Sequence, residues 1–421
     1  MRPAPPLPCG RPTRPTCAAS AAPGRSPATR SFGGDRAPSR TDRQGGTEPA
    51  GPVRFGSGPP PPVVKHSAGN RGEKRMEFGL MSLGDHLPDP ATGRRTSQVE
   101  RFRSIVDYAR LGEELGFAAF HLGEHHFSQY IVSVPQMVLA AVAEHTSRLI
   151  LSTGVTLLPH HDPLRIAEDY ASLDVLSHGR AELVVGRGVF PDTYRQMGQD
   201  IALSREMTAE GLDLLRLLWT QENVSWSGRF RAPLAGVTQQ PRPVQRPHPA
   251  IYLSGSSPDA VDMAAATGLP IAIAIVSTGI APLAELCGRY REKYRESGND
   301  PASMKVALSV HVHVDRDGQR ARDYFGPHQF GYLNWVLSEI GGDRKFPPSH
   351  TTLGNPDCIA VAGTPGEVAR DLGRIIETAG GADRLIIQSD QGGMPWDRVH
   401  RSVTLFAEEV MPILAAEAAV A

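Results

Sequence analysis

Apolar segments of strand length alternate with segments of helical periodicity, and the pair recurs eight times along the chain. Their near-continuous apolar character predicts a parallel sheet covered by helices on both faces. Eight repeats favour closure into an α/β fold of the (β/α)8 TIM-barrel type. A doubly wound open sheet is the alternative, although its usual glycine fingerprint after the first strand is missing. The predicted strands are residues 77–83, 118–122, 149–157, 181–185, 250–253, 270–276, 305–314 and 384–388.

Two segments interrupt the alternation. Residues 222–249, after the fourth strand, hold a hairpin-like sequence and five prolines, and residues 326–355, after the seventh strand, follow no regular pattern. We therefore expect insertions after strands four and seven. The predicted helices are residues 98–115, 136–144, 163–176, 205–219, 258–267, 282–296, 365–378 and 396–414.

The first 75 residues differ from the rest of the chain. They hold 15 of the 37 prolines and 13 basic residues against 4 acidic ones, without apolar periodicity. Such a segment buries too little apolar surface to offset its ordering entropy, so residues 1–75 are predicted to be a disordered extension. Their composition also fits a transit peptide or a proline-rich linker. Because composition changes abruptly at Met76, we expect the natural chain to begin there, with residues 76–421 as one domain.

Charge and cysteine content narrow the class of protein. Residues 76–421 carry 31 basic and 41 acidic side chains, a net charge of −10, which argues against a nucleic-acid partner. No segment is long and apolar enough for a membrane helix. Only Cys287 and Cys358 lie in the predicted domain, without metal or redox spacing, which fits a reducing cytoplasm.

Polar residues gather after the predicted strands, where a barrel of this type carries its active groups. Strand four ends in Gly186-Arg187-Gly188, and Arg205 follows at a predicted helix start with Ser204 as its N-cap. Strand five ends in Ser254-Gly255-Ser256-Ser257-Pro258, whose backbone N–H groups and hydroxyls suit an anion. Together these elements predict a phosphate site. The alternatives are that Arg187 pairs with Glu182, and that the serines merely cap a helix.

Histidines follow two of the strands and lie within a third. In Glu124-His125-His126, one histidine should face the barrel mouth and exchange protons, oriented by the neighbouring carboxylate. His160-His161, placed between Pro159 and Pro163, is predicted to be loop. His311 and His313 share one face of strand seven, as in some metal-dependent hydrolases, but we expect solvated or core roles for them and no metal site.

In sequence order, these residues resemble the bacterial luciferase-like, flavin-dependent monooxygenases. The resemblance rests on E-H-H-F, on the stretch from L-P-H-H-D-P to L-V-V-G-R-G, on S-R, on I-Y-L-S-G-S-S, and on V-A-G-T-P-G-E-V with L-F-A-E-E-V-M-P-I-L near the end. It covers residues 76–414. It implies a TIM barrel, a cytoplasmic homodimer, and a monooxygenase that uses reduced FMN as co-substrate, usually supplied by a separate flavin reductase. Oxygen would pass from O2, through a flavin C4a-peroxide, to a small organic substrate.

The resemblance also implies roles for individual residues. His125 matches the catalytic base, with Glu124 beside it as the second catalytic candidate. The FMN phosphate would be held by Arg187, Arg205 and Ser257, while Gly255 and Ser256 approach the flavin through their backbone. Strand three, with Thr153, would underlie the flavin ring, and Gly154-Val155 falls where the family often has a non-proline cis peptide. Residues 326–355 correspond to a mobile lid.

Two residues depart from the family pattern, and they bear on the expected function. Gly186 replaces a reactive cysteine of bacterial luciferase, and Ala260 replaces a threonine that contacts phosphate there, so light emission is not expected. Glu124-His125-His126 is closer to the FMN branch than to the deazaflavin F420 branch. The alternatives that remain are an F420- or NAD(P)H-linked oxidoreductase and a flavin-binding protein without turnover. The sequence does not identify the organic substrate.

Overall fold

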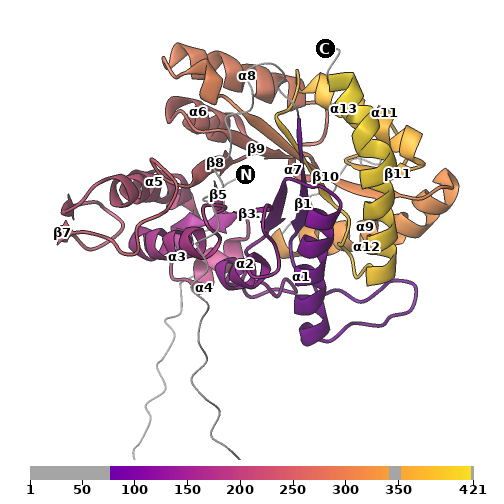
Figure 1. Cartoon of the computed structure of the whole chain (residues 1–421), viewed down its shortest axis with the longest axis horizontal. Helices are drawn as coiled ribbons and strands as arrows, with labels where there is room; N and C mark the ends of the chain where they lie inside the picture. The colour runs from indigo at the N-terminus through magenta and orange to yellow at the C-terminus, as the bar shows by residue number, and fades with distance from the viewer. Residues whose placement is uncertain (1–75, 341–351, 419–421) are drawn as a thin grey trace, which may run out of the picture. The chain divides into compact units, whose positions relative to one another are not determined.

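Parallel strands form a barrel surrounded by helices (Figure 1). The computed structural model describes residues 76–340 and 352–418, so the predictions for residues 1–75 lie outside it. The barrel strands are β1 (Glu77–Ser82), β2 (Ala119–Leu122), β3 (Ile150–Thr153), β4 (Thr156–Leu157), β5 (Glu182–Gly186), β8 (Ala250–Ser254), β9 (Ile271–Ala274), β10 (Val306–Val314) and β12 (Arg384–Gln388). All eight predicted strands are confirmed, the third being split into β3 and β4.

The hydrogen-bonded path runs β3-β2-β1-β12-β10-β9-β8-β5-β4, and every pair along it is parallel. Its two ends meet because β3 and β4 are consecutive in the chain. An isolated parallel bridge between Leu151 and Ala181 also joins β3 to the residue before β5. The barrel therefore closes, and the carboxyl ends of its strands share one rim.

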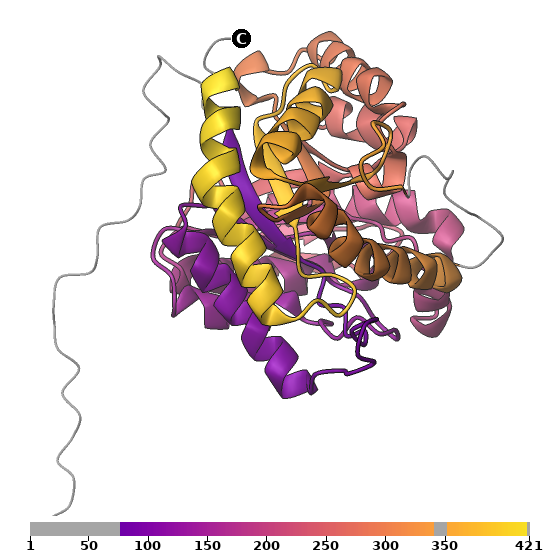
Figure 2. The same cartoon turned by 90° about the vertical axis from the view of Figure 1, so that its right-hand side faces the viewer.

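Helices follow the strands, and side-chain caps fix where several of them begin. Ser97 and Glu100 form a capping box at α1, and Thr364 and Glu367 form another at α11. The main helices are α1 (Gln98–Glu114), α2 (Pro135–Ala143), α3 (Pro163–Leu176), α5 (Ser204–Thr220), α6 (Pro258–Ala266), α8 (Leu283–Glu296), α11 (Pro365–Thr378), and α12 (Trp396–Leu405), which a π-helical turn (Phe406–Val410) joins to α13 (Met411–Ala418). Figure 2 shows α12 and α13 as one long helix beside α1.

The barrel interior has a small apolar layer with charges beneath it. Val184, Tyr252, Ala307 and Ile386 form the apolar layer. Toward the amino ends of the strands, buried Arg384 donates to Glu182 at 2.6 Å and to Glu77 at 2.7 Å. Burying charges requires such pairing. This pair also shows that Glu182 is engaged by Arg384, so the alternative pairing of Glu182 with Arg187 was wrong.

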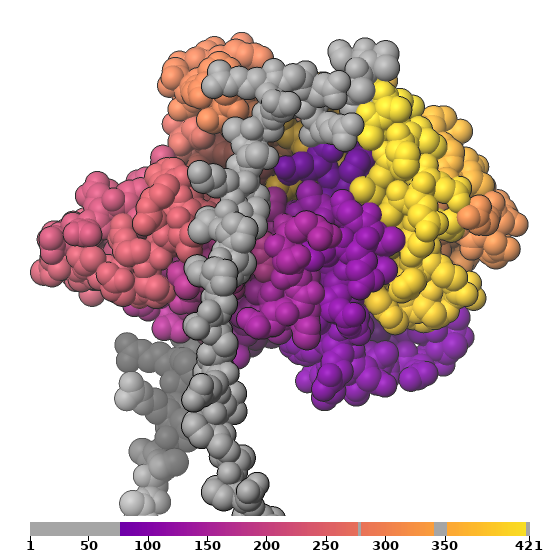
Figure 3. Space-filling view, in the orientation of Figure 1, coloured from indigo at the N-terminus to yellow at the C-terminus, as the bar shows by residue number. Residues whose placement is uncertain are grey.

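The two predicted insertions had different outcomes. The first contains the antiparallel hairpin β6 (Val224–Trp226) and β7 (Leu234–Val237), which lies at the outer edge near α5 (Figures 1 and 3). The second prediction was wrong for residues 326–340, which belong to the helix α9 (Gly318–Ile340). Although Pro327 lies inside α9, buried Phe325, Gln329 and Tyr332 recur at helical spacing. Residues 341–351 lie outside the described residues.

Shorter elements were not predicted. The strand β11 (Ala360–Gly363) extends the sheet beside β10, with His311 opposite Ala360. The short helices α4 (Pro191–Gln196) and α7 (Ile275–Thr278) follow β5 and β9. A 3-10 turn over Leu158–His160 precedes α3, and another over Ile201–Leu203 precedes α5. These elements span a few residues each, so their periodic signal is too weak to recognise in sequence.

A buried carboxylate fastens the first insertion to the barrel. One oxygen of Asp174 accepts hydrogen bonds from the backbone N–H groups of Val244 and Gln245, at 2.7 and 2.9 Å. Its other oxygen accepts from the Gln245 side chain at 2.7 Å and from the Ala181 N–H at 3.3 Å. The returning segment is thereby held against α3 and β5.

Replacing Asp174 with alanine should lower the free energy of unfolding by about 1–3 kcal/mol, because buried N–H donors lose their acceptor. Urea denaturation followed by circular dichroism measures this change. Asp213, which is exposed on α5, provides the matched control, and Asp213→Ala should leave the midpoint in place. Equal midpoints for both variants would contradict the fastening role.

Candidate active site

Four strand ends bring the sequence-predicted site residues to one rim of the barrel. The segment after β2 carries His125, the break between β3 and β4 carries Gly154, β5 leads into Arg187, and β8 leads into Ser256. Because β2, β3, β5 and β8 run parallel, their carboxyl ends face the same side. The structure therefore gathers the predicted residues at the mouth of the barrel.

His125 is held between aromatic rings. Its imidazole stacks on Tyr130 with a centroid separation of 3.7 Å, and the edge of Phe190 lies 5.5 Å away. Burial lowers the pKa of His125 to about 3, so the ring is neutral at physiological pH. Its Nδ1 atom is buried and has no hydrogen-bond partner among the described residues. The free nitrogen of a neutral imidazole can accept a hydrogen bond from a bound reactant, and the pKa of His125 has to rise when that reactant binds for the ring to hold a proton.

Glu124 does not orient His125. One of its carboxylate oxygens accepts hydrogen bonds from His126 at 2.9 Å and from His161 at 2.6 Å, and the other accepts from the Leu157 N–H at 3.2 Å. Burial alone would raise the pKa of Glu124, but the two histidine bonds outweigh it and lower the pKa to about 2. The carboxylate thus orients His126 and not His125, because residues 124 and 126 of an extended segment point to the same side.

The same three residues have metal-like spacing. The ligand atoms of Glu124, His126 and His161 lie within 4.8 Å of one another. Their hydrogen bonds account for this proximity without an ion. His161 was predicted to be loop, and the paired histidines at 160–161 were the only sequence signal for its role. Buried His311 bonds to Gln329 at 2.9 Å and buried His313 stacks on Phe325, as expected for core histidines.

The predicted phosphate elements contact one another in pairs. The Arg187 guanidinium donates to the Ser204 hydroxyl at 3.3 Å, and Arg205 forms an ion pair with Asp259 in the first turn of α6. The prediction that Ser204 is the N-cap was wrong, because the preceding 3-10 turn leaves Ser204 already helical, with φ −56° and ψ −33°. Buried Ser204 instead links the end of β5 to the start of α5.

The turn after β8 begins α6 as its sequence predicts. Ser257 is the N-cap, its hydroxyl accepts from the Ala260 N–H at 3.4 Å, and Pro258 occupies the first turn. The capping interpretation is therefore confirmed, and it leaves other N–H groups of the first turn available to an anion. Gly255 has no room for a side chain, since a Cβ there would lie 2.1 Å from the Cβ of Ala260.

The break between β3 and β4 contains the cis peptide Gly154-Val155, as the resemblance implied. Val155 packs against the interior layer, and a Cβ on Gly186 would lie 2.4 Å from its Cγ2 atom. This contact explains the glycine at 186. Thr153 was expected beneath the flavin ring. Its buried hydroxyl accepts a hydrogen bond from the Tyr170 hydroxyl at 2.9 Å, so the Thr153 side chain points toward α3. Only the backbone of Thr153 could therefore contact a cofactor.

These residues fit a flavin phosphate. Arg187 makes one long hydrogen bond to a neutral hydroxyl, and the first turn of α6 offers N–H groups. Arg205 would have to share or release Asp259 to reach the same anion. The aromatic neighbours Tyr130 and Phe190 were missed from sequence, because isolated aromatic residues in loops carry no pattern.

Buried histidines make stability depend on pH. Burial lowers the pKa of His313 to about 4, whereas the unfolded side chain titrates near 6.5. Below that unfolded value the unfolded chain binds the proton more readily, so stability falls as the pH drops from about 6.5 toward 4. His313→Phe should reduce the loss of unfolding free energy between pH 7.5 and 5.5 by about 1 kcal/mol. Urea titrations at both pH values test this, with exposed His145→Phe as control; an unchanged loss would contradict it.

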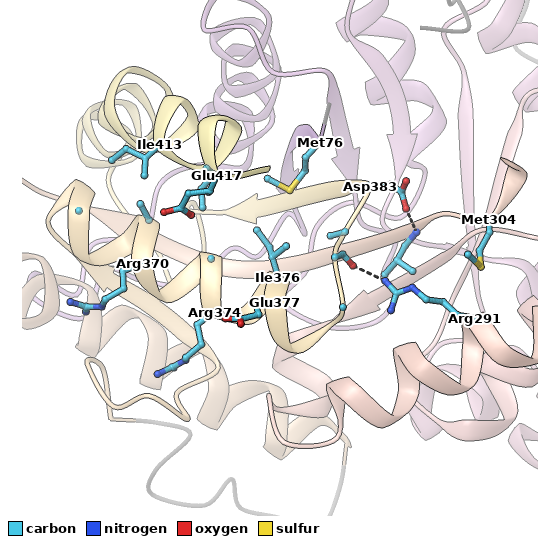
Figure 4. A pocket seen from close by; sticks show the side chains of 18 residues that line it. Met76, Arg291, Met304, Arg370, Arg374, Ile376, Glu377, Asp383, Ile413 and Glu417 are labelled. Carbon is cyan, nitrogen blue, oxygen red and sulfur yellow. Dashed lines mark hydrogen bonds between the residues drawn. The ribbon is translucent and has the colours of Figure 1, made fainter. Parts of the chain in front are cut away.

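A large cavity lies elsewhere in the molecule. It has a volume of about 1170 Å³ and is lined by α8, α11 and α13 and by the segments that precede β1 and β12, with residues that include Met76, Arg291, Arg370, Arg374 and Glu417 (Figure 4). Arg291 is engaged there, donating to the Gly381 carbonyl at 2.8 Å. Met76 and Asp383 precede β1 and β12, so this cavity opens at the amino ends of the strands. Catalytic groups of TIM barrels lie at the opposite rim, so we do not place the active site there.

The chain belongs to the luciferase-like monooxygenase family, whose model matches residues 76–382. It is 30% identical over 343 residues to limonene 1,2-monooxygenase of Rhodococcus erythropolis, a match that covers 80% of this chain and 86% of that protein. It is 22% identical over 351 residues to the oxygenase component of flavin-dependent trigonelline monooxygenase from Acinetobacter baylyi, covering 80% and 95%.

Solved structures support the barrel assignment. Monooxygenase RslO1 from Streptomyces bottropensis superimposes with a TM-score of 0.71 at 30% identity, covering 80% of this chain and 99% of that one. The oxygenating constituent of 3,6-diketocamphane monooxygenase from Pseudomonas putida, in complex with FMN, gives 0.65 at 20% identity, covering 80% and 98%. An F420-dependent secondary alcohol dehydrogenase gives 0.63 at 20% identity, covering 81% and 99%. No helix among the described residues is long and apolar enough to cross a membrane.

Proposed function

We propose that the protein is a monooxygenase that binds reduced FMN at the carboxyl end of the barrel and uses O2 to oxygenate a small organic molecule. The observation that carries the proposal is the shared rim on which a neutral, unpaired His125 and the paired elements Arg187–Ser204 and Arg205–Asp259 lie. Membership in the luciferase-like family and its monooxygenase relatives support it.

Each group has a defined share of the work. Arg187, the first turn of α6 and a released Arg205 hold the phosphate, and the backbone at Gly154-Val155 supports the ring. Reduced flavin supplies the electrons that activate dioxygen. His125 Nδ1 accepts or returns a proton beside the ring, while Tyr130 and Phe190 keep water away from it. Glu124 acts at a distance, by fixing His126 and His161.

The proposal also covers a partner protein and the oligomeric state. A separate reductase would supply the reduced FMN, in line with the relative named as an oxygenase component. We also propose a cytoplasmic homodimer. Exposed apolar side chains on the outer helices, Val99 on α1, Met137 on α2 and Leu176 on α3, are the kind of surface that a partner subunit covers. Light scattering of the purified chain measures the assembly.

The alternative is an F420-linked oxidoreductase on the same barrel, which an F420-dependent structural neighbour keeps open. Oxidation of reduced FMN under 18O2 separates the two. The protein is mixed with alkanals, cyclic ketones or limonene, and products are weighed by mass spectrometry. One 18O atom in an organic product is the expected result. Substrate oxidation with F420 in the absence of oxygen would instead establish the alternative.

A further inference from the structure

A second polar group lies at the barrel mouth, built from β10, β12, α9 and the loop after β12. His311 and Gln388 are paired in register on neighbouring strands. Their side chains point into the barrel, since Ala307 and Ile386, which lie at even spacing from them, form the interior layer. Gln329 reaches this place from α9, and Gln391 reaches it from the loop. All four side chains are at most 3% exposed.

Gln329 and Gln391 are bonded to each other, and each amide uses only one of its two polar atoms. The Gln329 oxygen accepts from His311 Nδ1 at 2.9 Å and from the Gln391 nitrogen at 3.0 Å. The Gln329 nitrogen and the Gln391 oxygen are buried and have no hydrogen-bond partner among the described residues. The two bonded amides thus carry one free donor and one free acceptor, and, within the described part of the chain, the Gln388 nitrogen is a second free donor in the same group. Buried polar atoms without partners are costly, so a bound group that pairs with both is favoured.

This polar group is connected to the candidate active site through aromatic side chains. Tyr332, on α9, lies 5.5 Å from His311 between ring centroids, and its hydroxyl is 2.6 Å from that of Tyr130. Tyr130 in turn stacks on His125. The free donor and acceptor are therefore linked through His311, Tyr332 and Tyr130 to the histidine to which we assign proton transfer.

We propose that Gln329 and Gln391 recognise a neutral edge with adjacent C=O and N–H groups, as in an amide, lactam or imide. The Gln329 nitrogen donates to the carbonyl, and the Gln391 oxygen accepts from the N–H. Such an edge has two sources, the pyrimidine ring of the flavin or an amide-bearing substrate. The nearest partners of the pair are amides and an imidazole that burial keeps neutral, which disfavours a carboxylate.

The first test compares two flavins that differ only at N3. The inference rests on the proposed function, so binding of reduced FMN to the full chain is measured first, without oxygen, by quenching of the protein's tryptophan fluorescence, and every flavin in this test is used in its reduced form. The affinity of 3-methyl-FMN, which lacks the N3–H donor, is then compared with that of FMN. If the flavin edge is the ligand, FMN should bind about three- to tenfold more tightly than its methylated form, and Gln391→Met should abolish this preference.

The second arm addresses a substrate amide. The protein loaded with FMN is titrated calorimetrically with 2-piperidone and with cyclohexanone, which lacks the N–H. A preference for 2-piperidone that Gln391→Met removes, with the FMN preference absent, assigns the pair to the substrate. Gln239→Met is the matched control, since Gln239 is also buried with an unpaired oxygen but lies in the first insertion. It should leave both preferences unchanged.

The outcomes separate the two proposals. If FMN binds but neither N–H-bearing ligand is preferred, the recognition role of Gln329 and Gln391 is overturned while the proposed function stands. If FMN does not bind at all, the proposed function fails, and the 2-piperidone titration of the protein alone still decides the role of the pair. Thermal melting of each variant establishes that it is folded.

Discussion

His125→Ala should reduce the rate of product formation by about 10²–10⁴-fold, the usual contribution of a positioned acid–base group. Its imidazole is the neutral, unpaired group at the rim of the barrel, and alanine leaves no atom there to take a proton. Because the phosphate elements lie on β5, α5 and α6, affinity for FMN should remain nearly unchanged. Consumption of reduced FMN without oxygenated product, with hydrogen peroxide released instead, is the expected signature.

Product formation is measured by chromatography, with reduced FMN supplied by a reductase. Exposed His145→Ala, at the end of α2, is the control for histidine removal and should retain the wild-type rate. A His125→Ala protein that binds FMN and keeps the full product yield would remove His125 from the chemistry. The low pKa of His125 gives a second expectation, that titration of its ring does not affect the rate near pH 6.5. Wild type and His125→Gln should therefore show the same pH dependence of the rate around that value.

Arg187→Met should weaken FMN binding by about 10- to 100-fold, since hydrogen bonds to a charged partner are worth about 1.5–3 kcal/mol. Methionine keeps much of the side-chain volume and loses the charge. Arg187 is the better placed of the two arginines, because its side chain bonds to a neutral hydroxyl, whereas Arg205 is paired with Asp259.

Riboflavin gives this prediction its control, because it lacks the phosphate. Wild type and Arg187→Met should bind riboflavin equally, so the whole loss of affinity should appear with FMN alone. Arg195→Met, at an exposed arginine on α4 that pairs with Asp192, should leave both affinities in place. An equal loss for riboflavin and FMN would mean that the variant disturbs the barrel and not a phosphate contact.

The fold was predictable from sequence because long periodic segments carry most of it. The eight barrel strands and the helices over 163–176 and 365–378 were recognised from apolar spacing and capping residues. The helix α9 was missed because Gly326, Pro327 and Gly331 resemble a loop, whereas tertiary burial of Phe325, Gln329 and Tyr332 stabilises it. Local signals therefore failed where packing against the barrel decided the structure.

The site was predictable to a smaller extent. Motif order located the strand ends, and the cis peptide at Gly154-Val155 was anticipated from the family resemblance. Contacts between distant residues were not, since nothing near Glu124 in the sequence indicates that His161 is its partner, 37 residues away. The bond between Gln391 and Gln329 spans 62 residues and is likewise invisible in the chain. Such pairs become apparent only once the barrel closes.

The crystal structure of the chain with FMN tests the central claim most directly. We expect electron density at the carboxyl rim, with the phosphate within hydrogen-bond distance of Arg187 and the first turn of α6, and the ring against Gly154-Val155 beside His125. Density for FMN in the cavity lined by Met76, Arg291 and Arg370, at the amino ends of the strands, would contradict it.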